Sequence, residues 1–131
     1  MRKKHQDQFA ELNRRIDGKV STNRFNRYML STDGSIYQVE PAAVVYPKTT
    51  DDVLRVVEFS KVHGFTIHPR GAGSGLCGSA LGKGIVIDFT RFMNRLISVN
   101  FEEKYFECEP GYRFGELEAV LKGKRLFFPP D

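Results

Sequence analysis

Short apolar runs along the chain predict four strands. Residues 44–46 form the first, which Pro47 closes, and residues 65–68 form the second. Residues 85–89 read IVIDF, with so little alternation that we expect both faces of this third strand to be buried. Residues 104–110, which read KYFECEP, predict the fourth.

Apolar residues at helical spacing predict three helices, over 6–16, 50–63 and 114–121. The second is the best defined, because residues 49–52 supply hydroxyl caps and acidic side chains near the positive end of the helix dipole. Gly64 is a typical helix stop. The faces expected to be buried are Phe9, Leu12 and Ile16 in the first helix and Val53, Val56, Val57 and Ser60 in the second.

The order strand, helix, strand makes a βαβ unit, which places its two strands parallel in one sheet. The predicted fold class is therefore α/β, a small and mainly parallel sheet flanked by helices. A turn is expected at Thr32, Asp33 and Gly34, ahead of this unit.

The stretch HPRGAGSGLCGSALGKG, residues 68–84, holds six of the twelve glycines of the chain. Glycine loses the most backbone entropy on folding and adds no side chain to a core, so this concentration needs a reason. A glycine-rich loop after a strand brings backbone N–H groups close to a phosphate without Cβ clashes. The alternative, from the residues alone, is a flexible surface loop or a tight corner.

Two familiar phosphate-binding patterns do not fit this loop. The Walker pattern fails because Cys77 stands where its first glycine belongs and Gly84 follows the lysine. The dinucleotide pattern GxGxxG occurs formally at 73–78, but it has to open a helix, and here the chain runs directly into the strand at residue 85. What remains is a long loop of small residues between two strands. Arg70, at its start, can brace the loop or reach an anion.

Composition and charge exclude several classes of protein. A chain of 131 residues, 40% apolar and 27% charged, is typical of one soluble domain, and no apolar run reaches the roughly 18 residues of a membrane helix. The net charge of +4 comes from residues 1–28, which carry eight Lys or Arg against three acids. We expect a solvated basic face here and no nucleic-acid partner. Cys77 and Cys108 make no CxxC pair, so the predicted location is the cytoplasm.

The residues around the glycine loop resemble a known family. Residues 69–96, PRGAGSGLCGSALGKGIVIDFTRFMNRL, resemble the FAD-binding domain of the vanillyl-alcohol oxidase superfamily, in particular its glycolate oxidase and D-lactate dehydrogenase group. The family pattern is roughly P-R-G-x-G-[ST]-x-x-x-G, a hydrophobic strand ending in Asp, and then MN. Residues 31–53 look like the longer members, whose flavin half is fused to an iron–sulfur half, and residues 110–131 match the stretch after the loop. The resemblance covers residues 25–131.

In this family the backbone amides of the loop wrap the FAD pyrophosphate. The resemblance implies that the cradle is formed here by Arg70, Gly71, Ala72, Gly73, Ser74, Gly75 and Leu76. Pro110, Gly111 and Pro130 are similar to residues near the flavin. Relatives with covalent flavin carry His at the position matching Ser74, so the resemblance implies non-covalent FAD.

The resemblance also implies an organisation and a reaction. Residues 1–24 are expected to form a basic helical arm, and residues 25–131 the first subdomain of a PCMH-type FAD-binding domain. The second flavin half and the substrate cap are expected to lie outside this chain, which we expect to be inactive alone. The whole protein is expected to oxidise a 2-hydroxy acid such as D-lactate, glycolate or D-2-hydroxyglutarate, with no catalytic or metal-binding residue in this stretch. A different class, a non-catalytic phosphate-binding, nucleotide-binding or interaction module, is the alternative.

Partners follow from the same resemblance. The electron acceptor is expected to be an iron–sulfur cluster outside this chain, a quinone or an electron-transfer protein. Besides a free cytoplasmic location, a peripheral one at the inner membrane face is compatible with this. Exposed apolar surface would favour a homodimer.

Side chains near the loop are expected to have structural roles. Cys77 is interpreted as a small polar filler, Cys108 as core, and His68 as a structural histidine. Asp88 is expected to cap the turn that follows its strand. The aromatic residues expected in the core are Phe101, Tyr105, Phe106, Phe127 and Phe128.

Overall fold

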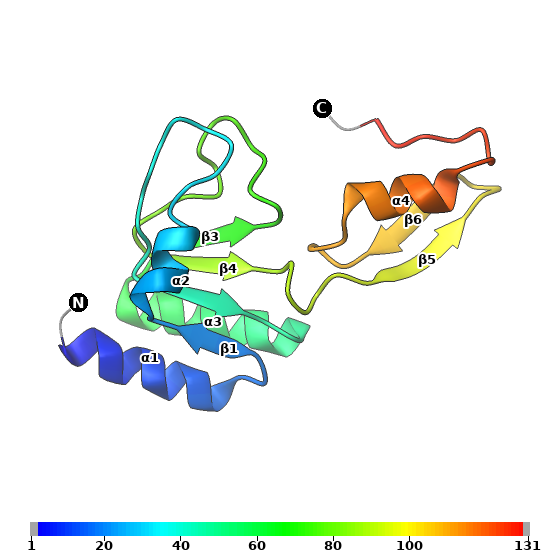
Figure 1. The fold of residues 1–131 in the computed structure, drawn as a ribbon. Coiled ribbons are helices and arrows are strands. Elements are labelled where there is room, and N and C mark those ends of the chain that lie inside the picture. The colour runs from blue at the N-terminus through cyan, green and yellow to red at the C-terminus, as the bar shows by residue number, and fades with distance from the viewer. Residues whose placement is uncertain (1–2, 130–131) are drawn as a thin grey trace.

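Two sheets organise the chain in the computed structural model, which describes residues 3–129 (Figure 1). The larger sheet consists of β1 (Lys19–Ser21), β2 (Ala43–Tyr46), β3 (Ile67–Arg70) and β4 (Ile85–Asp88). The smaller sheet is the hairpin of β5 (Leu96–Asn100) and β6 (Tyr105–Cys108), which lies apart from the larger sheet with one helix over it.

The larger sheet is mainly parallel, as predicted. Its order is β1-β2-β4-β3, with β4 parallel to both of its neighbours and β1 antiparallel to β2. Because β4 is the last of the three parallel strands in sequence but lies between the other two, strands cover both of its edges. All four of its residues are buried, which confirms the expectation from the IVIDF run. The predicted α/β class is confirmed.

Two helices form the core together with the sheet. α1 (Lys3–Arg15) packs beside α3 (Thr50–His63), and the Phe9 ring lies 5.7 Å from the Phe59 ring. Phe9, Leu12 and Ile16 are buried as predicted, so the basic start of the chain supplies part of the core. The predicted bounds of α3 are confirmed: the Thr49 side chain accepts the Asp52 N–H, and Gly64 ends the helix at φ 72°.

Several sequence expectations were wrong in detail. Val57 is 47% exposed, and Phe59 is buried instead, so the buried face of α3 is rotated from the predicted one. The second strand begins at Ile67 rather than at residue 65. Three short elements were missed, β1, α2 (Arg24–Met29) and β5, because three to six residues are too few to show a period.

The hairpin of β5 and β6, with the helix that follows it, is more open than predicted. α4 (Phe114–Leu121) has the predicted bounds, but the predicted fourth strand, β6, pairs antiparallel with β5 instead of joining the main sheet. Only Leu117 is buried in α4, because one short helix over a two-stranded ribbon covers little surface. Cys108 is half-buried instead of core. Four aromatic residues predicted as core are instead exposed by 39% to 82%, namely Phe101, Tyr105, Phe127 and Phe128.

An ion pair closes the base of the hairpin. The Glu109 carboxylate accepts the Arg95 backbone N–H at 2.8 Å and the Arg95 side chain at 2.7 Å and 3.1 Å. Hydrogen bonds from the Arg95 side chain, the largest cause, hold the pKa of Glu109 below its ordinary value of 4.5. The ionised carboxylate is therefore favoured in the folded state.

This pair gives the hairpin a pH dependence. A carboxyl group whose pKa is lower in the folded state contributes stability above its unfolded pKa, and loses it as the pH falls through the folded value. The wild-type chain is therefore expected to be more stable than Glu109→Gln at pH 7, with a difference that shrinks below about pH 4.5. Urea denaturation of both chains at pH 7 and pH 3.5 measures this. A difference that is unchanged at pH 3.5 would contradict it.

Candidate functional site

The glycine loop connects two parallel neighbours in the sheet. Residues 71–84 leave the carboxyl end of β3 and return to the amino end of β4, so the loop has to travel back along the sheet. Ligands of α/β proteins bind outside the carboxyl ends of parallel strands. The first half of the loop lies at that edge.

The return leg of the loop has glycines for packing reasons. A Cβ placed on Gly82 would lie 1.9 Å from Nε2 of His68, and one on Gly84 would lie 2.1 Å from the Thr66 carbonyl oxygen. His68 shares a hydrogen bond of 2.9 Å with the Thr66 hydroxyl. The expected structural role of His68 agrees with this geometry.

Two other glycines are required by the conformation of the loop. Gly73 and Gly78 have φ values of 70° and 75°, in the left-handed region that favours glycine. A Cβ on Gly73 would also lie 2.3 Å from the Arg70 guanidinium. The protein itself therefore accounts for both residues without a ligand.

Gly71 and Gly75 have no comparable reason within the described residues. The nearest atom to a Cβ on Gly71 would be the Pro110 carbonyl oxygen, at 3.9 Å, and a Cβ on Gly75 would meet only the Ser79 hydroxyl, at 3.2 Å. Neither residue has a positive φ. Side chains could therefore stand at both positions, so their absence leaves the loop backbone open to a ligand.

The loop also presents unused hydrogen-bond donors. Within residues 3–129, no hydrogen bond has a backbone N–H of residues 72–79 as its donor. Most of these residues are exposed, including Ser74 and Leu76. Successive free amides in a glycine-rich turn make a concave site for an anion, most often a phosphate.

The side chain of Arg70 supports this loop. Its side chain is buried, 9% exposed, and Nη1 donates to the Thr32 carbonyl at 2.8 Å. The guanidinium fills the space next to Gly73. Of the two roles open from the sequence, these contacts support bracing the loop.

The ionised carboxylate of Asp33 lies close to Arg70. Hydrogen bonds from the Ser35 side chain and backbone, and more weakly the charge of Arg70, hold the pKa of Asp33 below its ordinary value of 3.8. Asp33 was expected only as a turn residue, and sequence reasoning missed its place beside the loop. The turn signal was present, but nothing in the sequence indicates what the turn contacts.

The predicted residues from the later part of the chain lie near the start of the loop. The Pro110 carbonyl oxygen is the nearest atom to a Cβ placed on Gly71, at 3.9 Å. Gly111 donates to the Met93 carbonyl at 2.8 Å, and a Cβ on it would lie 2.4 Å from the Phe89 carbonyl oxygen. Gly111 therefore has a packing role of its own, whereas Pro130 lies outside the described residues.

Remaining chemistry near the site is limited. The Asp88 carboxylate caps the following turn as predicted, accepting the Thr90 N–H at 2.9 Å and its hydroxyl at 2.7 Å. Cys77 is exposed on the loop. In the part of the chain that the structure describes, no group of three or more His, Cys, Asp or Glu side chains could hold a metal ion, and no helix is long and apolar enough to cross a membrane.

Comparisons of sequence identify relatives of this chain. The D-2-hydroxyglutarate dehydrogenases of Pantoea ananatis and Pseudomonas putida are 38% and 39% identical to it over 117 residues, which are 87% of this chain and 11% and 12% of theirs. Glycolate oxidase subunit GlcD of Bacillus subtilis is 33% identical over 97 residues, which are 72% of this chain and 20% of that protein. The chain thus spans only a small part of the length of these relatives.

Solved structures confirm the fold, and a family match confirms the resemblance found in the sequence. The 4-ethylphenol oxidase from Gulosibacter chungangensis superposes with a TM-score of 0.77 at 18% identity, over 99% of this chain and 27% of that one. p-Cresol methylhydroxylase superposes with a TM-score of 0.71 at 24% identity, over 94% of this chain and 25% of that one. The FAD binding domain family matches residues 41–131. Since this match covers more than half of the chain, the chain belongs to the family of FAD binding domains.

Proposed function

We propose that this chain holds FAD non-covalently through the glycine loop, as one part of an oxidoreductase that oxidises a 2-hydroxy acid. The proposed cradle is the backbone of residues 70–76, with Pro110 and Gly111 beside it and Pro130 as a further contact. The observation that carries the proposal is the row of unused amides in a loop whose Gly71 has no packing reason to lack a side chain.

The donors of this loop fit a pyrophosphate. Each backbone N–H donated to a charged oxygen contributes about 1.5–3 kcal/mol, so a few such bonds give useful affinity. Arg70 contributes in two ways, because its guanidinium holds the loop backbone and its buried positive charge favours an anion above it. The exposed Ser74 hydroxyl would be an additional donor.

The division of chemistry follows from the residues present. Bound FAD would supply the redox step, accepting a hydride from the α-carbon of the substrate. The side chains at the cradle contribute binding and orientation, and none of residues 71–76 is an acid or a base. Non-covalent binding is supported by Ser74, which stands where covalently flavinylated relatives carry a histidine.

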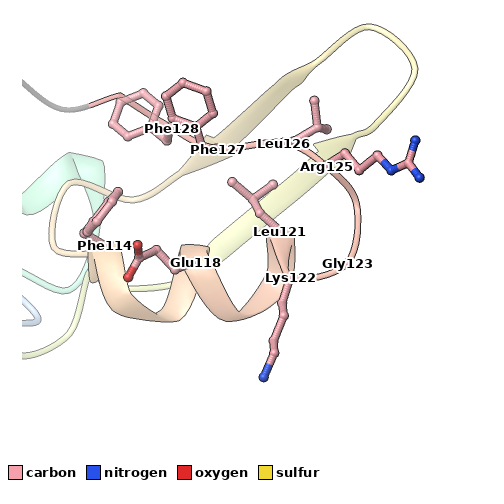
Figure 2. A pocket seen from close by; sticks show the side chains of 9 residues that line it. All are labelled: Phe114, Glu118, Leu121, Lys122, Gly123, Arg125, Leu126, Phe127 and Phe128. Atoms are coloured by element: carbon pink, nitrogen blue, oxygen red, sulfur yellow. The ribbon is translucent and has the colours of Figure 1, made fainter.

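The substrate and partners are proposed more broadly. The names of the relatives support a 2-hydroxy acid of the D-2-hydroxyglutarate, glycolate or D-lactate type. An iron–sulfur cluster, a quinone or an electron-transfer protein would accept the electrons, with the protein in the cytoplasm or at the inner membrane face. Figure 2 shows apolar side chains of α4 and of residues 126–128 around one pocket, and this exposed surface supports the proposed homodimer.

FAD binding is tested by placing a side chain where only a ligand would meet it. Gly71→Val is expected to weaken FAD binding by about 30-fold or more, which corresponds to the loss of about one charged hydrogen bond. Titration of FAD fluorescence in the 131-residue chain measures this affinity. Dialysis should remove the flavin completely if it is bound non-covalently.

Gly115→Val is the matched control, because a Cβ on Gly115 would also meet open space, but far from the loop in sequence. Gly73→Asp would be a poorer probe, since it would strain the backbone and strike Arg70 even without a ligand. Equal affinities in Gly71→Val and in the wild type would place FAD elsewhere. No binding by the wild type would mean that this chain does not hold FAD by itself.

A further inference from the structure

A second segment of the chain lies against the glycine loop. Residues 31–39, which we call the strap, form a loop whose ends are joined by the Val39 N–H donating to the Ser31 carbonyl at 2.8 Å. Thr32 and Gln38 pair as an isolated bridge, so the base of the strap is closed. Figure 1 shows the strap and the glycine loop side by side above the sheet. The FAD binding domain match begins only at residue 41, after the strap.

The tip of the strap has a conformation of its own. The Asp33 carboxylate accepts both the backbone N–H and the hydroxyl of Ser35, at 2.9 Å and 2.5 Å. The Ser35 hydroxyl in turn accepts the Tyr37 N–H at 3.2 Å. These bonds make a small Asx-type turn at the tip of the strap.

Backbone contacts join the strap to the start of the cradle. The Gly34 N–H donates to the Gly73 carbonyl at 2.8 Å, and Arg70 donates to the Thr32 carbonyl at 2.8 Å. Arg70 therefore touches both segments, with its guanidinium between the strap and Gly73. The Gly73 carbonyl thus accepts from the strap and not from an amide of the loop. The amides of residues 72–79 donate to no group within the described residues, so they stay available to a ligand.

Close packing continues along the loop. A Cβ on Gly34 would lie 2.7 Å from the Ser74 carbonyl oxygen and 3.1 Å from that of Gly75. Gly34 has no positive φ, so the glycine loop, rather than the turn, is what excludes a side chain there. Further along, a Cβ on Gly78 would lie 3.0 Å from the Tyr37 ring.

We propose that the strap is a positioning element that holds the phosphate-binding loop in its binding conformation before the cofactor arrives. A glycine-rich loop without such a support would have to be ordered by the ligand, and that ordering would reduce affinity. The role in affinity rests on the proposed FAD function, whereas the ordering of the loop does not. Gly34 and Tyr37 are the strap residues through which this positioning acts.

Hydrogen exchange without FAD tests the ordering of the loop. In Gly34→Ala the two hydrogen-bonded amides that report on the loop, that of residue 34, which donates to the Gly73 carbonyl, and that of Leu81, which donates to the Gly78 carbonyl, are expected to exchange about tenfold faster than in the wild type, while β2 and β4 keep their protection. Ile36→Ala is the control, because Ile36 lies on the same strap and is 95% exposed. Unchanged exchange in Gly34→Ala would overturn the proposal.

Affinity for FAD separates a positioning role from a merely structural one. Tyr37→Ala is expected to weaken FAD binding by about tenfold, and Tyr37→Phe, which keeps the ring against Gly78, is expected to restore it. Equal affinities in both variants and the wild type would overturn the proposed role of Tyr37. If the wild type binds no FAD but Gly34→Ala still loosens the loop, the strap is confirmed as a loop support and only the FAD function fails.

Discussion

Asp52→Asn is expected to lower the free energy of unfolding by about 3 kcal/mol or more. Asp52 is 1% exposed, and its carboxylate accepts the backbone N–H groups of Asp17, Gly18 and Lys48 at 2.8, 3.0 and 2.8 Å. A buried donor that loses its acceptor costs the free energy of its desolvation. Asparagine would keep one oxygen but would turn an NH₂ group toward a backbone N–H.

The position of Asp52 explains why this one residue contributes so much to the free energy of unfolding. It stands in the first turn of α3, where a negative charge is also favoured by the helix dipole. Its three partners belong to the link between α1 and β1 and to the exit from β2. Asp52 therefore joins the start of α3 and the nearby exit from β2 to the link between α1 and β1, which lies 34 and 35 residues away in the sequence.

Urea denaturation at neutral pH measures this effect. Asp51→Asn is the matched control on the same turn, because Asp51 makes only an exposed ion pair with Arg55, and such pairs contribute about 0–1 kcal/mol. If Asp52→Asn unfolds at the same urea concentration as Asp51→Asn, the three bonds do not contribute as the geometry indicates. Circular dichroism without urea shows whether the variant still folds.

Gly111→Ala is expected to destabilise the chain by about 2–3 kcal/mol, even in the absence of any cofactor. The new Cβ would lie 2.4 Å from the Phe89 carbonyl oxygen and 2.8 Å from that of Met93. Both neighbours are backbone atoms of the turn that leaves β4, so neither can move aside as a flexible side chain would. The change would also strain the hydrogen bond from the Gly111 N–H to Met93.

Thermal unfolding of the chain without FAD distinguishes this packing role from a purely ligand-facing one. Gly115→Ala serves as the control, since a Cβ at that position meets nothing within 4 Å and alanine favours the helix. If Gly111→Ala is as stable as this control and loses only FAD affinity, Gly111 is there for the cofactor. A loss of stability first would mean that its proposed cofactor contact follows from its place in the fold.

Much of the sheet could be predicted because its signals are local. α3 has a cap, acids in its first turn and a glycine stop, and all three lie within sixteen residues of sequence. The buried run of β4 is equally direct. β5 was missed, and β6 was expected in the main sheet although it pairs with β5. The pairing of a strand depends on its partner, which cannot be read from the residues of that strand alone.

The candidate site could likewise be predicted only in part from the sequence. Six glycines mark the loop in the sequence, but they do not say which of them a ligand needs. Only the packing distances separate Gly73 and Gly78, which the loop itself requires, from Gly71, which has open space before it. The contact between the strap and the loop could not be predicted from the sequence either, because nothing in the residues around Gly34 or Gly73 indicates that the two segments pack together.

The sequence by itself determined the α/β class, three of the helices, the parallel strands and the position of the glycine loop. These follow from the periodicity of burial and from residues such as Gly64 that act on their own neighbours along the chain. The tertiary structure alone decided that Asp52 accepts hydrogen bonds from the link between α1 and β1, that the Arg70 side chain donates to Thr32, and that the strap lies against the glycine loop. Those contacts join residues far apart in the chain, and their free energies depend on distances that folding sets.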